Sequence, residues 1–225
     1  MLKRLGRLVF LAICCAFLLS LLAVVPLRWL NPPTTAFILA DATPRQSANR
    51  GWITWDEMGS SLPLAVVASE DQKFADHWGV DVESIRKSVV QYADGARLRG
   101  ASTITQQVAK NLYLWRGRSF VRKGLEAYLA LLIEATWSKQ RILEVYLNIA
   151  EFGPGIYGAG AAAEILFGKS PMQLSDNEAA LLAAVLPNPN RLHANRPSDY
   201  VLERRTWIVN QIQRLRREQW LTRVE

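Results

Sequence analysis

The sequence predicts a mainly α-helical single domain that is preceded by one N-terminal transmembrane helix. The 225 residues suit one domain of ordinary size, and half of them are hydrophobic, so a sizeable core can be buried. After residue 60, apolar residues recur at helical spacing through most of the chain, whereas strand signals are few and short. A long apolar run near the N-terminus supplies the membrane segment.

The apolar run extends from Leu8 to Val25 and is interrupted only by Ser20, which is long enough to cross most of a bilayer as a helix. Arg28 and Trp29 follow it and suit the far membrane interface. A cleaved signal peptide is the alternative, but the run is longer than a usual signal core and no small-x-small site follows it. We therefore expect an uncleaved anchor.

The net charge of +7 is distributed unevenly, because residues 1–30 carry four cations and no acid. Lys3, Arg4 and Arg7 precede the apolar run, so the positive-inside rule places the N-terminus in the cytoplasm and the rest of the chain across the membrane. A basic excess could serve nucleic acid, an anionic membrane surface or a phosphorylated substrate, and this distribution favours the membrane. The only cysteines are Cys14 and Cys15 within the run, which excludes a disulfide framework.

The expected domains and elements follow in order. Residues 1–30 form the cytoplasmic tip and anchor, residues 31–50 a linker or early strand, and residues 51–225 the domain. Residues 52–58 read as a short strand or turn, residues 94–100 as a loop, and residues 153–160 as a glycine-rich break. Helices are expected at 62–74, 81–92, 102–114, 120–137, 139–149, 161–167, 175–186 and 200–220.

Several short patterns are discounted. An S-x-x-K match at Ser84 and an S-D-N match at Ser175 are typical of penicillin-binding transpeptidases, but the K-T-G element is absent. The glycines of residues 153–158 match G-x-G-x-x-G without the preceding strand that a nucleotide site requires. His77 is expected to be a buried or capping imidazole.

Two groups of residues could carry chemistry. Glu70 closes an apolar helix, where partial desolvation suits a carboxylate to proton transfer, although on this pattern alone a solvated helix end is the better explanation. Cations crowd residues 110–123 and Glu126 follows them by one helical turn. Such a cluster can bind a diphosphate, with the acid holding a divalent metal, but a solvated helix face with an ion pair is also open.

Five motifs decide between these interpretations. The stretches EDQKFADHWG (70–79), GASTITQQVAKNLYL (100–114), RKGLEAYLALLIE (122–134), SKQRILEVYLN (138–148) and GIYGAGAAAEILFGKSPMQLSDNEAALLAAVLPNP (155–189) resemble, in order, the signature motifs of the peptidoglycan glycosyltransferase family. They cover most of residues 62–191. The chain looks like the monofunctional, biosynthetic form of this family.

The resemblance implies a lysozyme-like, mostly helical fold with a small membrane-proximal lobe, and lipid II and the growing glycan strand as substrates. It implies Glu70 as the general base and Glu126 as a second catalytic glutamate linked to Mg²⁺ or Mn²⁺. Diphosphate contacts would come from Lys110, Arg118 and Lys123, while Ser102, Thr103, Gln107 and Asn111 would orient sugars or phosphates. The N-terminus would lie in the cytoplasm and the catalytic domain in the periplasm, on the inner membrane.

Further expectations concern partners and rival functions. The cluster Leu112–Trp115 is expected to dip into the membrane interface. Protein partners would belong to the cell-wall synthesis or division machinery. The alternatives are a lysozyme-like lytic enzyme, which has no need of a diphosphate cluster, and a non-catalytic anchored scaffold.

Overall fold

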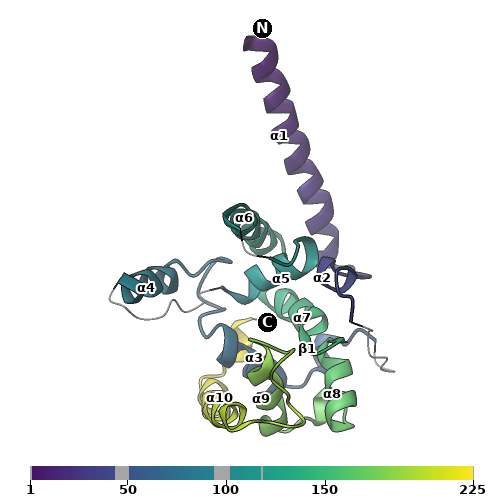
Figure 1. Cartoon of the computed structure of the whole chain (residues 1–225), viewed down its shortest axis with the longest axis vertical. Helices are drawn as coiled ribbons and strands as arrows, with labels where there is room; N and C mark the ends of the chain where they lie inside the picture. Colours follow the sequence, from purple (N-terminus) through teal and green to yellow (C-terminus); the bar gives the residue numbers. More distant parts are fainter. Residues whose placement is uncertain (1, 44–50, 94–101, 118, 225) are drawn as a thin grey trace.

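The computed structural model describes residues 2–43, 51–93, 102–117 and 119–224, and these are mainly helical (Figure 1). Helix α1 (Leu2–Val24) stands out from the rest of the molecule and continues into a 3₁₀ turn (Val25–Arg28). Among the described residues, Lys3–Arg28 is the one helical stretch long and apolar enough to cross a membrane, and little of it is buried. The predicted fold class is therefore confirmed.

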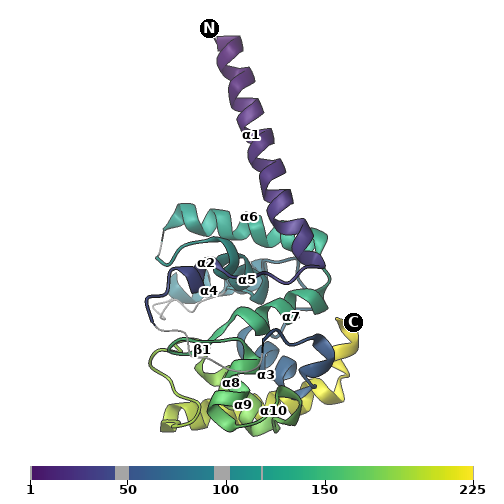
Figure 2. The ribbon, with the colours of Figure 1, turned by 90° about the vertical axis from the view of Figure 1, so that its right-hand side faces the viewer.

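The base of α1 is fixed to the domain by hydrogen bonds to backbone carbonyls. The Tyr113 hydroxyl donates to the Ala23 carbonyl (3.0 Å), and the Trp137 indole donates to the Val24 carbonyl (3.0 Å). Arg141 donates from Nη2 to the Leu27 carbonyl at 3.0 Å. These carbonyls lie at the helix C-terminus, where no intrahelical donor is available to them. The anchor thus leaves the domain from a defined point beside α6 (Figure 2).

The domain has two layers, of which the one nearer the anchor is termed the membrane-side layer. It consists of α2 (Ala36–Leu39), α5 (Ile104–Tyr113), α6 (Phe120–Thr136) and α7 (Lys139–Ile149). Helix α5 packs against both α6 and α7. The last three helices begin at Thr103, Ser119 and Ser138, and each of these side chains accepts a backbone N–H of the first turn, as N-caps do.

The other layer, termed the distal layer, lies farther from the anchor (Figure 2). It contains α3 (Ser61–Glu70), α8 (Ala159–Phe167), α9 (Asp176–Val185), α10 (Asp199–Arg217) and a hairpin of β1 (Glu151–Gly153) and β2 (Ile156–Tyr157). Helix α3 packs against α9 and α10 and is buried from Leu62 to Ala68. A helix that is apolar all round belongs in a core, as here.

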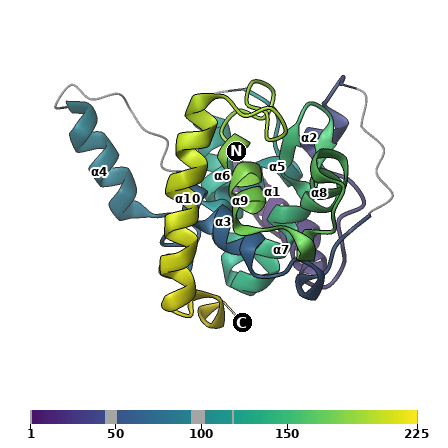
Figure 3. The same ribbon diagram turned by 90° about the horizontal axis from the view of Figure 1, so that it is seen from below.

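Three 3₁₀ turns and α4 complete the domain. Helix α4 (Val82–Ala93) projects sideways from the two layers (Figure 3). The turns lie at Trp55–Glu57, Pro171–Gln173 and Trp220–Arg223.

The expected helices match the observed ones to within a few residues, while the expected loop at 94–100 lies outside the described residues. The discounted Ser175 is the N-cap of α9.

The expectation that Leu112–Trp115 enters the membrane is wrong for its two leucines. Leu112 and Leu114 are only 7% and 5% exposed and belong to the core. Leu112 lies on the row of α5 residues that recur every four positions, and α5 packs against α6 and α7. Of this cluster, Trp115 is exposed. A broader exposed apolar face lies on α6, formed by Phe120, Val121, Leu125, Tyr128 and Leu131.

Candidate active site

Glu70 lies at the C-terminal end of α3, where this buried helix meets α5 of the membrane-side layer. Its side chain is 12% exposed. The residue lies on the wall of a cavity of about 360 Å³, together with Asp71, Ser102, Thr103 and the cationic Lys73 and Lys87 among others. The position combines a largely desolvated carboxylate with access for a substrate, which suits a proton acceptor.

Gln107 of α5 fixes the orientation of the Glu70 carboxylate. Its Nε2 donates to Glu70 Oε2 at 3.0 Å, and its Oε1 accepts from the Tyr146 hydroxyl of α7 at 3.2 Å. Tyr146 is fully buried, and burial raises the pKa of its hydroxyl well above the ordinary value, so it stays a donor. The predicted site residue Gln107 therefore binds the predicted base directly.

Arg204 of α10 also reaches the base, and the sequence interpretation gave it no function. Its Nη2 lies 3.8 Å from Glu70 Oε1 and donates to the Ser69 hydroxyl at 2.9 Å. The Ser69 hydroxyl in turn donates to Glu70 Oε1 at 3.1 Å. The contact joins residues 135 positions apart, so no local pattern signalled it. The guanidinium therefore lies beside the carboxylate and holds the serine hydroxyl that bonds it.

Asp71 and His77 connect the end of α3 to the start of α5. Asp71 Oδ2 accepts the backbone N–H of Ile104 at 3.0 Å, in the first turn of α5. His77 Nε2 lies 3.0 Å from both Asp71 oxygens, and the two side chains are only 8% and 5% exposed. The expected buried role of His77 is confirmed. The pair fixes the two helices that carry Glu70 and Gln107.

Glu126 lies in α6 and pairs with two cations. Its Oε2 accepts from Arg122 Nη1 at 2.7 Å and its Oε1 from Lys123 Nζ at 2.5 Å, while its side chain is 3% exposed. Lys123 also donates to the Ser102 hydroxyl at 2.8 Å, and Ser102 lines the same cavity as Glu70. The hydrogen bond therefore links the second glutamate and its lysine to the cavity of the base.

Lys110 lies about one helical turn after Gln107 on α5. It lines a second cavity, of about 180 Å³, with Gln107, Asn111 and Tyr146 among others. Burial lowers the pKa of the Lys110 ammonium, while the Glu126 carboxylate acts in the other direction. A desolvated cation of this kind interacts strongly with an anion that enters the cavity. Gln107 lines this cavity and bonds Glu70, so base and cation are neighbours.

The remaining predicted site residues are Thr103 and Arg118. Thr103 is the N-cap of α5, and its hydroxyl donates to the Gly79 carbonyl at 2.5 Å, which gives it a clear structural role. Arg118 lies outside the described residues. Arg116, which the sequence placed in the same cluster, donates to the Tyr157 hydroxyl at 2.9 Å, and Tyr157 lines the second cavity.

The predicted metal ligand Glu126 has neighbours that do not fit a divalent cation. Both of its oxygens accept hydrogen bonds from cations. In the part of the chain that the structure describes, no group of three or more His, Cys, Asp or Glu side chains could hold an ion. Mg²⁺ and Mn²⁺ favour several oxygen ligands, and here two positive side chains occupy the carboxylate. Metal binding stays a prediction, and no chemical step below depends on it.

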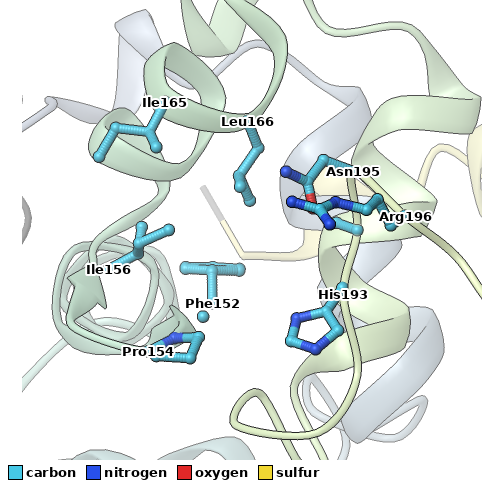
Figure 4. Close-up of a pocket in the computed structure, with 10 residues that line it drawn as sticks. Phe152, Pro154, Ile156, Ile165, Leu166, His193, Asn195 and Arg196 are labelled. Carbon is cyan, nitrogen blue, oxygen red and sulfur yellow. The ribbon is translucent and has the colours of Figure 1, made fainter.

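A third cavity, of about 380 Å³, lies in the distal layer (Figure 4). Phe152, Ile156, Ile165 and Leu166 form its apolar part, and His193, Asn195 and Arg196 line another wall. None of the predicted site residues lines it, so it is separate from the cavities around Glu70 and Lys110.

Comparison with known proteins gives one consistent answer. A family model described as transglycosylase matches residues 38–213. A biosynthetic peptidoglycan transglycosylase of Shewanella frigidimarina is 54% identical over 84% of this chain and 82% of its own length. The protein of the same name from Stutzerimonas stutzeri is 50% identical over 92% and 88%, and that from Pseudomonas fluorescens is 46% identical over 100% and 96%.

Proposed function

The chain belongs to the transglycosylase family and is a peptidoglycan glycosyltransferase, and we propose that Glu70 is the general base of its reaction. The substrates of such an enzyme are lipid II and the growing glycan strand. The observation that carries the proposal is the placement of one largely buried carboxylate, held by Gln107, between a cavity that it lines itself and a cavity that contains Lys110.

The proposed step begins with deprotonation of the acceptor sugar. Glu70 takes the proton of the 4-hydroxyl as that oxygen forms a bond to the anomeric carbon of the growing strand. The bond from this carbon to the lipid diphosphate breaks, and its electron pair leaves with the phosphate oxygen. The result is a β-1,4 linkage with inversion. Gln107 and Arg204 hold the carboxylate at its position without donating a proton to the sugar.

Cations on the membrane-side layer would stabilise the departing diphosphate. Negative charge grows on its oxygens as the glycosidic bond breaks, so fixed cations lower the energy of the transition state more than that of the bound substrate. Lys110 and Lys123 are the described candidates, and Arg118 is proposed by family resemblance alone. In this interpretation Glu126 is a positioning residue, because its two ion pairs hold Arg122 and Lys123 in place.

The anchor and α6 together suggest how the enzyme sits on the membrane. Lys3, Arg4 and Arg7 favour a cytoplasmic N-terminus and thus a catalytic domain on the periplasmic side of the inner membrane. Helix α6, which carries the exposed apolar residues from Phe120 to Leu131, lies on the side from which α1 emerges (Figure 2). We place this face in the membrane interface, where it would hold the groove at the level of the lipid-linked substrate.

Polymerisation of purified lipid II by the full-length chain in detergent micelles tests the function. We expect the wild type to produce long glycan strands and Glu70→Gln to reduce the rate by about 10²- to 10⁴-fold, the usual range for loss of a general base. Asp76→Asn, at an exposed acid within the same motif that pairs with Arg223, is the matched control and should keep its activity. Products released from finished sacculi, without polymer from lipid II, would favour a lytic enzyme instead.

A further inference from the structure

The stretch between anchor and domain contains a helix that contacts the active-site cations. Helix α2 (Ala36–Leu39) begins after Thr35, whose hydroxyl accepts the Ile38 N–H at 3.1 Å, and it packs against α5. From their composition, residues 31–50 were expected to form a linker or an early strand. The centre of the Phe37 ring lies 5.2 Å from Lys110 Nζ and 5.3 Å from the guanidinium carbon of Arg116.

Phe37 also lines a cavity of the active site. It shares the cavity of about 180 Å³ with Lys110, Asn111 and Gln107. Arg116 lies at the edge of this cavity, since its Nη2 donates to Tyr157 and lies 3.7 Å from Glu151, and both of these residues are part of the lining. One aromatic ring therefore lies beside two cations that would meet the same anion.

The physical effect of the ring differs from that of a carboxylate. The face of an aromatic ring attracts a cation, which offsets part of the desolvation that lowers the pKa of Lys110. A carboxylate beside Lys110 would also offset this desolvation, but it would neutralise the positive charge of the ammonium. The described carboxylate Glu126 bonds Arg122 and Lys123 instead, and Arg116 has Asp41 at 3.4 Å. The ring thus keeps the charge of Lys110 available for a substrate.

We propose that Phe37 is a positioning residue of the diphosphate site, holding Lys110 and Arg116 beside one cavity so that a lipid-linked diphosphate meets both. The inference rests on the proposed function. It makes the segment that follows the anchor a part of the substrate site. Substrate affinity then depends on this segment even where membrane anchoring has no influence, as in detergent micelles.

The test is a comparison of KM and kcat for lipid II in micelles, with the full-length chain. Phe37→Leu keeps an apolar side chain and removes the ring, and we expect KM to rise about fivefold with kcat unchanged, as the loss of one or two cation–π contacts implies. Phe37→Trp, with a stronger cation-binding face, should restore the wild-type KM. Leu39→Ala, at an exposed apolar residue of the same helix, is the matched control and should leave both constants unchanged.

Calorimetric titration with inorganic diphosphate supplies an independent measurement on the same variants. We expect diphosphate to bind Phe37→Leu more weakly than the wild type and to bind Phe37→Trp as the wild type does. The melting temperatures of these two variants and of the wild type should be equal. Unchanged KM and diphosphate affinity in Phe37→Leu would overturn the inference, as would an equal loss in Leu39→Ala or a fall in kcat alone. If the wild type binds diphosphate with this dependence but does not polymerise lipid II, the proposed function fails and the inference about the site survives.

Discussion

The two layers of the domain contribute residues to the cavities around Glu70 and Lys110 but are stabilised in different ways. In the distal layer, α3 is buried from Leu62 to Ala68 and presents a single acid, Glu70, at its end. In the membrane-side layer, α6 carries a buried acid with two cations beside it and an apolar face open to the surroundings. An apolar helix therefore carries the base, which Gln107 and Arg204 orient, whereas the buried acid of α6 holds cations for an anionic leaving group. The difference indicates a division of labour between proton transfer and charge stabilisation.

Among the substitutions that test this difference between the layers, Glu126→Gln is expected to have the largest effect, a loss of unfolding free energy. The substitution leaves the guanidinium of Arg122, 11% exposed, without its charged partner. Removing one member of a buried pair costs about 3–5 kcal/mol in unfolding free energy. Denaturant unfolding of the full-length chain in micelles measures this loss. Lys87→Gln, which removes an exposed pair with Glu83, is the control and should change stability little. Equal effects of the two changes would mean that the buried pair of α6 stabilises the fold no more than an exposed pair does.

A fluorophore on residue 120 tests the exposed face of the membrane-side layer. Phe120 is 98% exposed, and burying such a side chain in the membrane interface contributes about 2 kcal/mol. With Cys14 and Cys15 changed to Ala, a label on Phe120→Cys in lipid nanodiscs should be quenched strongly by a quencher attached to the lipid chains. A label on Tyr200→Cys in the distal layer should not be quenched. Equal quenching at both positions would contradict the assigned membrane surface.

Tyr146→Phe should have a smaller effect, because Tyr146 acts on Glu70 only through Gln107. The change leaves Gln107 Oε1 without its donor in a buried setting, at a cost of about 1–3 kcal/mol. Because Gln107 then holds Glu70 less firmly, we expect kcat to fall by about tenfold, the factor for 1.4 kcal/mol, with KM little changed. Steady-state kinetics with lipid II measures both constants. A change in KM alone would mean that Gln107 serves substrate binding rather than the base.

The smallest effect concerns an ion pair at the edge of the distal layer. Hydrogen bonds from Arg216 hold the pKa of Asp176 below its ordinary value, although burial opposes them. A depressed folded-state pKa contributes stability above the unfolded value of about 3.9, and this is lost as the pH falls through the folded value. Asp176→Asn should therefore reduce stability at pH 7 by at most about 1 kcal/mol and change it little at pH 2. Thermal melts across this range measure the difference, and a larger deficit at pH 2 than at pH 7 would refute the assignment.

The sequence predicted the helices well because their signals are local. Thr103, Ser119 and Ser138 begin helices through contacts within one turn, and α3 is recognisable from its apolar composition. The contact of Arg204 with Ser69 was not predictable, since it depends on how α10 packs across α3. Likewise, α2 lies in a stretch without periodicity and is defined by its tertiary contacts with α5.

The same limit applies to the site residues, because a local pattern does not show what surrounds a side chain. Glu70 and Lys110 were identified through motifs, whereas composition and spacing alone favoured a solvated surface. The structure adds that Glu70 is largely buried and that Gln107 lies between it and Lys110. The opposite case is Leu112 with Leu114, where an apolar cluster was interpreted as a membrane contact and proved to be core. Composition cannot distinguish these two apolar environments.

The division of labour between the layers can be measured by lipid II binding to two full-length variants in micelles. Both carry Glu70→Gln, so that neither consumes the substrate, and one also carries Lys110→Met. We predict that Glu70→Gln alone binds lipid II and that adding Lys110→Met weakens binding by roughly tenfold or more, as the loss of a charged hydrogen bond implies. Equal affinities of the two variants, or no detectable binding by Glu70→Gln, would contradict the account.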